Sequence, residues 1–249
     1  MASTQPVDRL IGLRPLIRFG VVVFALSGLL FLLYPAVRPW HDESTVGGAI
    51  ASMSSGAWVA AHLFAILSLI LMPLGMLALC AMSAGTRGGR MTFAATVIMW
   101  LGAGLTLPYY GAEDFALHAI ARAAGSGAQL DLLALVNAVR FGTPAAVTFA
   151  AGLALLGIAG VLLAISIWRS AILPRFSGVP LAIALVLLIP QFYLPTWARI
   201  AHGILVAGAL LWLAWVLWTK SAARARDALP AALQTAESRS ARVVMEETR

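Results

Sequence analysis

The chain has 249 residues, of which 61% are hydrophobic and 11% are charged, and its formal net charge is +7. A soluble domain carries about 25% charged residues, so this composition excludes a water-soluble globular protein. It predicts an all-α fold, a polytopic membrane helical bundle, because a helix satisfies its own backbone hydrogen bonds in lipid. The basic residues flank apolar runs, which indicates contact with the lipid bilayer and its anionic headgroups and argues against nucleic acid as a partner.

The N-terminal segment 1–15 is followed by six apolar runs, each long enough to cross a hydrocarbon core of about 30 Å. The first run is too long for the hydrophobic part of a cleaved signal peptide, so we expect it to be retained as a span. The runs form one transmembrane domain at 16–219, with spans predicted at 16–37, 57–82, 91–111, 144–168, 178–195 and 197–219. Residues 220–249 are polar and rich in Ala, Ser and Arg, which predicts a largely disordered tail.

Residues 112–142, between the third and fourth spans, are too polar to cross the membrane and predict an amphipathic helical hairpin. We expect this hairpin to lie outside the cytoplasm as an outer cap on the bundle. Its first helix continues or restarts after a break at Pro108. In that helix Asp114, His118 and Arg122 form a stripe at intervals of four residues, which is typical of a solvated face.

The orientation follows from the distribution of the 17 Lys and Arg residues. Thirteen of them lie on the side of the membrane that holds both termini. The other four lie on the opposite side, and they are Arg38, Arg122, Arg140 and Arg199. Because positive residues are retained inside, this asymmetry predicts a multi-pass protein of the cell membrane with both termini cytoplasmic, and places the anionic headgroups it meets on the cytoplasmic side.

Glu113 is the most informative residue of the hairpin. It shares a helix face with Leu117 and Ile120, which is the apolar side, so we expect its carboxylate to point toward the bundle. A carboxylate at the edge of the hydrocarbon must be paired, protonated or hydrated, because an isolated charge is costly there. The partners predicted for it are Arg199, His62 and His202.

The four histidines all lie on the outer side or in the outer leaflet, which suggests a metal site or an acid–base site at that face. Imidazole and carboxylate groups suit a divalent metal ion, and a carboxylate–imidazole pair also suits proton transfer. The candidate metal ligands are His62, Glu113, His118 and His202, and the candidate catalytic group is Glu113. Such a site requires residues from three helices to converge.

A second hypothesis is haem binding by His62 and His202. The motifs WVAAH and WARIAH place these two histidines at similar depths on two spans, and small residues accompany each of them. Two facing imidazoles could ligate haem iron, with Arg199 near a propionate.

Two further hypotheses stay open. Pro73, Pro108 and Pro190 interrupt three spans, and broken helices can mark the path of a small solute through a transporter. Alternatively, the protein has a structural or regulatory role and its histidines serve only to pack helices. The hypothesis that the sequence favours is an outward-facing pocket of histidines and a carboxylate that binds a cation or exchanges protons.

Overall fold

The computed structural model describes the backbone of residues 6–247 and the side chains of residues 12–222. Every secondary-structure element among the described residues is a helix. In chain order the elements are α1 (Pro6–Val37), α2 (Val46–Met53), α3 (Gly56–Ser83), α4 (Gly89–Gly111), the π-helix η1 (Ala112–Ala116), α5 (Leu117–Gly125), α6 (Leu132–Phe141), α7 (Thr143–Ser170), α8 (Val179–Val186), the 3₁₀-helix η2 (Pro190–Tyr193) and α9 (Thr196–Glu247).

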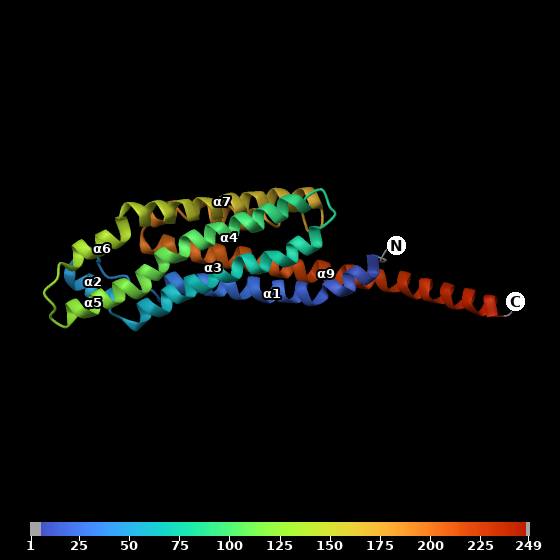
Figure 1. The fold of residues 1–249 in the computed structure, drawn as a ribbon, viewed down its shortest axis with the longest axis horizontal. Coiled ribbons are helices and arrows are strands. Elements are labelled where there is room, and N and C mark those ends of the chain that lie inside the picture. The colour runs from blue at the N-terminus through green and yellow to red at the C-terminus, as the bar shows by residue number, and fades with distance from the viewer. Residues whose placement is uncertain (1–5, 248–249) are drawn as a thin grey trace.

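The long helices form a closed ring. α1 packs against α3, α3 against α4 and α4 against α7, and then α8 contacts both α7 and α9 before α9 returns along α1. Figure 1 shows α2, α5 and α6 gathered at one end of the bundle, which we call the cap end. Both chain ends lie toward the opposite end, the tail end, where α9 projects past the other helices (Figure 1).

Five helical segments are long and apolar enough to cross a membrane, and the fold is all-helical over the described residues, as the sequence predicts. They are Gly12–Val37, Gly56–Ser83, Gly89–Gly125, Thr143–Ser170 and Thr196–Ala222. Many large apolar side chains on these segments are exposed, as expected for helices whose surroundings are lipid.

The segment predicted as the fifth of six spans, 178–195, is not a single long helix. It consists of the eight-residue α8, a short turn and η2, because Pro190 lacks an amide hydrogen and cannot continue the α-helical pattern. The segment nevertheless follows α7 in the antiparallel direction. Gly178 lies against Ala164, Gly160 against Ala182, and Phe192 against Phe149. It therefore completes the ring of six elements as a shorter, interrupted element between α7 and α9.

Small residues and paired hydroxyl groups bring the helices together inside the bundle. A Cβ atom on Gly102 of α4 would lie 2.9 Å from the backbone oxygen of Gly152 on α7, so these two helices touch through their backbones. Between α1 and α3, Ser27 and Ser68 each donate a hydrogen bond to the other's carbonyl oxygen, at 2.9 Å and 2.8 Å. Such contacts replace the hydrophobic driving force that helices lack in lipid.

The cap end has a small apolar core of its own. α4, η1 and α5 form one continuous helical run, so the predicted break at Pro108 does not occur. α5 contacts α6, and both contact α2, a helix in the first loop that the sequence analysis did not predict. The side chains buried between them are Ala49, Met53, Trp58, Leu117, Ala121, Leu132 and Val136.

The two ends of the chain differ in part from the predictions. α1 begins at Pro6, within the predicted N-terminal segment 1–15, and residues 1–5 lie outside the described part of the chain. Where we expected a largely disordered tail, α9 continues as a helix to Glu247. The physical reason is composition, since Ala, Arg and Glu all have a high intrinsic helix propensity.

Candidate functional site

The cap end of the bundle contains a cavity of about 550 Å³, a volume typical of small-molecule sites. It lies among α1, α3, the run from α4 to η1, the end of α6, the start of α7, η2 and the start of α9. Its wall combines charged groups with many aromatic rings. The lining residues are Tyr34, Arg38, Glu43, His62, Tyr109, Tyr110, Glu113, Arg140, Phe141, Ala146, Phe149, Ala150, Leu153, Ile189, Phe192, Tyr193 and Arg199.

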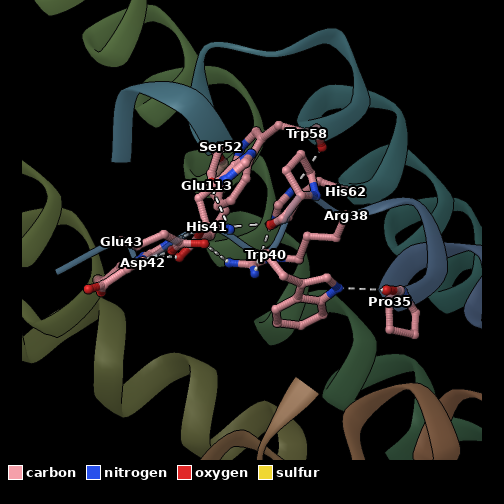
Figure 2. A network of polar contacts seen from close by, with 12 residues as sticks. Pro35, Arg38, Trp40, His41, Asp42, Glu43, Ser52, Trp58, His62 and Glu113 are labelled. Carbon is pink, nitrogen blue, oxygen red and sulfur yellow. Dashed lines mark hydrogen bonds and ion pairs between the residues drawn. The ribbon is translucent and has the colours of Figure 1, made fainter. Parts of the chain in front are cut away.

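Four of the charged groups form a continuous chain of ion pairs. Arg140 binds Glu113 through two bonds, Nε to Oε1 at 2.6 Å and Nη2 to Oε2 at 2.9 Å. The Nη1 atom of Arg140 lies 2.8 Å from Oε2 of Glu43, and Oε1 of Glu43 accepts a hydrogen bond of 2.7 Å from Arg38. Figure 2 shows three residues of this series of ion pairs, Arg38, Glu43 and Glu113, close together near the loop after α1. The four charges sum to zero.

Arg140 is placed by the fold of α6. The side chain of Asp131 caps the helix by accepting a hydrogen bond of 3.0 Å from the amide of Ala134. Leu132 and Val136 then anchor the helix in the apolar core of the cap end, so that Arg140, in the last turn, lies over the cavity. Burial lowers the pKa of Arg140, but Glu113 and Glu43 outweigh this effect and raise the pKa above its ordinary value.

Trp58 connects the π-turn of η1 to the arginines. The side chain of Trp58 is fully buried, and its Nε1 donates a hydrogen bond of 2.7 Å to the backbone oxygen of Glu113. The guanidinium groups of Arg38 and Arg140 lie 4.7 Å and 5.8 Å from the Trp58 ring, within the range of cation–π attraction. The indole of Trp58 thus contacts the backbone of Glu113 and two arginines, of which Arg140 binds the Glu113 carboxylate.

His62 stands beside Glu113 with one nitrogen free to accept a proton. Its Nδ1 lies 2.8 Å from the carbonyl oxygen of Trp58, and a carbonyl oxygen accepts only, so Nδ1 carries the hydrogen. In the neutral ring Nε2 is therefore a bare acceptor, and it lies 3.9 Å from Oε2 of Glu113. The rings of Tyr34 and Tyr110 pack around the imidazole, which is nearly inaccessible to solvent.

Arg199 differs from the other two arginines of the cavity. Its Nε donates a hydrogen bond of 3.3 Å to Oε1 of Gln191, and its guanidinium lies over the rings of Trp40 at 4.7 Å and Phe192 at 5.1 Å. Among the described residues it forms no ion pair with a carboxylate. Its positive charge is therefore held in place without being neutralised, and the cavity carries a net positive charge.

Asp114 and His118 lie on the cap side of η1 and α5, away from the cavity lining. His118 shares a hydrogen bond of 2.7 Å, through Nδ1, with the carbonyl oxygen of Met53 and so attaches α5 to the end of α2. The prediction that Asp114 lies on a solvated stripe was wrong, because its side chain is completely buried. Its two carboxylate oxygens have no hydrogen-bond partner among the described residues. The π-turn and the covering cap helices explain the difference.

The fourth candidate, His202, lies in a different part of the ring and does not line the cavity. Its Nε2 donates a hydrogen bond of 2.8 Å to the carbonyl oxygen of Ala184, and its imidazole packs edge-on against Phe31 of α1. α1 packs against both α3 and α9, which carry His62 and His202, and so lies between these helices. Because α1 lies between the two helices, the imidazoles do not face each other across a space that haem could occupy.

The metal-site hypothesis requires His62, Glu113, His118 and His202 to converge, and of these four only His62 and Glu113 come together. Within residues 12–222, no group of three or more His, Cys, Asp or Glu side chains is placed to hold a metal ion. Both oxygens of Glu113 already accept hydrogen bonds from Arg140. The carboxylate of Glu113 thus fixes the position of Arg140 over the cavity.

Sequence reasoning identified Glu113 and His62 but missed the groups that pair with them. Arg140 and Glu43 carry the ion-pair chain, yet neither belongs to a local motif, and Arg140 lies 27 residues from Glu113. A usable signal was present in the charge distribution, because Arg38, Arg140 and Arg199 are three of the four basic residues assigned to the outer side.

Comparison of the chain with models of known protein families, with curated proteins and with solved structures gives no match. Its function is therefore inferred from its own residues.

We predict that Arg140→Ala destabilises the protein by roughly 3–5 kcal/mol, because it leaves Glu113 and Glu43 without their shared partner. Glu113→Gln in the same background should restore part of this loss, since a neutral amide is less costly to bury than a lone carboxylate. The free energy of unfolding in detergent solution measures both effects. Arg122→Ala removes an exposed arginine of α5 and is the control, with an expected change within about 0.5 kcal/mol. Equal stabilities of the Arg140 and Arg122 variants would contradict the prediction.

Proposed function

We propose that this chain is a multi-pass protein of the cell membrane whose cap end faces outward and binds an organic anion in the cavity at Arg199. The observation that supports this most directly is the charge of the cavity wall. Arg38 and Arg140 are neutralised by Glu43 and Glu113, whereas Arg199 retains an unpaired charge against aromatic rings.

The orientation in this proposal rests on the distribution of basic residues. Near the tail end, the described helix ends carry Arg87, Arg90, Arg169 and Lys220. The basic residues at the cap end are Arg38, Arg122, Arg140 and Arg199. By the positive-inside rule the tail end is cytoplasmic and the helical hairpin of α5 and α6 is extracytoplasmic. We further propose that α8 and η2 complete a sixth crossing, because they follow α7 from the level of Ala164 to that of Phe149.

Six crossings leave both termini in the cytoplasm, and five place them on opposite sides. The chain has a single cysteine, Cys80, so Cys80→Ser provides a background for single-cysteine variants. In intact cells an impermeant maleimide should label Gln129→Cys in the turn between α5 and α6. Ser3→Cys and Ser238→Cys should be labelled only after the cells are permeabilised. Labelling of Ser238→Cys in intact cells would show that α8 and η2 do not cross.

An organic anion fits the cavity better than a metal cation does. The aromatic residues Tyr109 and Phe149 stack at 3.9 Å and, with Phe192, form an apolar wall beside Arg199. A guanidinium in a site partly shielded from water attracts carboxylates, phosphates and sulfonates through charge-assisted hydrogen bonds. A cation would meet three arginines there, and the carboxylates that could attract it are already bound to two of them.

We predict that the purified protein binds hexanesulfonate, whose sulfonate is charged at every working pH and whose short chain can contact the aromatic wall. Arg199→Gln should weaken this binding about 10-fold to 100-fold, because a hydrogen bond to a charged group contributes about 1.5–3 kcal/mol. Isothermal titration calorimetry measures the affinity. Arg122→Gln removes an arginine outside the cavity and should bind like the unmodified protein. Equal binding of hexyltrimethylammonium, which has the opposite charge, would exclude an anion site.

Proton exchange at His62 is a second candidate function, favoured by the bare Nε2 atom that faces Glu113 across 3.9 Å. Protonation would add a positive charge to the cavity wall and should strengthen anion binding. The titratable or charged groups around this imidazole are Glu113 on η1, Tyr34 on α1, Tyr110 on α4, Arg38 in the loop after α1, and Arg140 on α6.

We predict that the affinity for hexanesulfonate rises between pH 7.5 and pH 4, because desolvation of the buried imidazole outweighs the attraction of Glu113 and delays protonation until the pH is well below neutral. In His62→Gln the affinity should be almost the same at the two pH values. The same calorimetric titrations, repeated at each pH, measure the effect. A pH dependence that survives in His62→Gln would assign the titration to another group.

A further inference from the structure

An apolar groove of about 330 Å³ leads away from the anion cavity along the bundle, between α7 and α8. Leu153 and Ile189 line both the cavity and the groove, so the two adjoin and only apolar side chains lie between them. The remaining lining of the groove is apolar, and Gly157 leaves part of its floor without a side chain. A ligand could therefore extend from Arg199 into the groove without crossing a polar barrier.

The groove follows the middle of α7 (Thr143–Ser170) and is long enough for part of an acyl chain. Along α7 it extends from Leu153 to Leu162, which at 1.5 Å per residue is about 13 Å, close to half of a hydrocarbon core of about 30 Å. Ile158 and Val186 in its walls are half exposed on the surface of the bundle. The groove thus opens sideways toward lipid and begins at the level of the cavity.

We propose that the ligand of this site is an anionic phospholipid of the leaflet at the cap end, with its phosphate at Arg199 and one acyl chain in the groove. This inference rests on the proposed function of the cavity and names the chemical class of its ligand. The exposed aromatic rings of Tyr193 and Phe141, which also line the cavity, are suited to the headgroup region where such a lipid would enter.

The cavity and the groove contribute different parts of the recognition. A groove in lipid gains little from apolar contact alone, because the acyl chain leaves an environment that is equally apolar. Selectivity must therefore come from the charge at Arg199, while the groove decides how long a chain can accompany the headgroup. An anionic phosphatidylglycerol should be preferred to the zwitterionic phosphatidylcholine, although both have the same acyl chains.

The experiment uses the full chain in nanodiscs that contain equal amounts of phosphatidylglycerol and phosphatidylcholine, with retained lipid counted by native mass spectrometry after release. Phosphatidylglycerol should be retained about fivefold over phosphatidylcholine, and Arg199→Gln should remove this preference, as expected for one basic residue near an anionic headgroup. Ala154→Phe and Val186→Phe fill the groove from its two walls and should each reduce retention severalfold. Ala151→Phe, on α7 but outside the groove lining, is the matched control and should retain lipid normally.

The outcomes separate this inference from the proposed function. If hexanesulfonate binds but phosphatidylglycerol has no preference, or if both groove variants retain it as Ala151→Phe does, the ligand is a soluble anion and the lipid assignment is wrong. If the groove variants lose the lipid and still bind hexanesulfonate, they are folded and the acyl-chain site is supported. If the unmodified protein binds neither hexanesulfonate nor phosphatidylglycerol, the anion site itself is excluded.

Discussion

The structure of the cap end depends on one constraint, the cost of a carboxylate at the edge of hydrocarbon. Glu113 is almost completely buried in the helical run that begins with α4, and an unpaired charge there would be costly. Arg140 neutralises it through two parallel hydrogen bonds, which requires α6 to fold back over the bundle. Arg140 has a third donor directed to Glu43, and through it the loop after α1 is attached as well. One buried charge therefore organises three segments that are distant in sequence.

The sequence predicts the helices that lipid requires and fails where proline, a π-turn or a distant partner determines the structure. Five predicted spans agree with long apolar helices, because hydropathy and length are local properties. The predicted span at 178–195 is interrupted near Pro190, and Asp114 is buried where a regular helical period placed it in solvent. Of the partners expected for Glu113, His62 lies 3.9 Å from it, whereas the residue that neutralises the carboxylate is Arg140. Pairing between α6 and η1 is set by tertiary packing, which the pattern of one helix does not contain.

The two functional hypotheses drawn from the histidines meet different physical obstacles. Haem requires facing imidazoles, but α1 lies between the helices that carry His62 and His202. A metal ion requires several converging ligands, but Glu113 is occupied by Arg140, and within residues 12–222 no three His, Cys, Asp or Glu side chains meet. The imidazole of His62 keeps a bare nitrogen directed at the cavity. Of the chemistry predicted from the sequence, the contact between the imidazole of His62 and the carboxylate of Glu113 is the part that the structure contains.

Arginine has two roles at this site: Arg38 and Arg140 are neutralised by carboxylates, and Arg199 keeps its charge. The difference depends on which groups contact each guanidinium. A carboxylate fixes the position of an arginine and also cancels its charge, as Glu43 and Glu113 do for Arg38 and Arg140. Aromatic rings and an amide oxygen can fix an arginine while leaving its charge intact, as Trp40, Phe192 and Gln191 do for Arg199. An arginine whose charge is not neutralised, in a cavity that adjoins a lipid-facing groove, is the arrangement that binding of an anionic amphiphile would require.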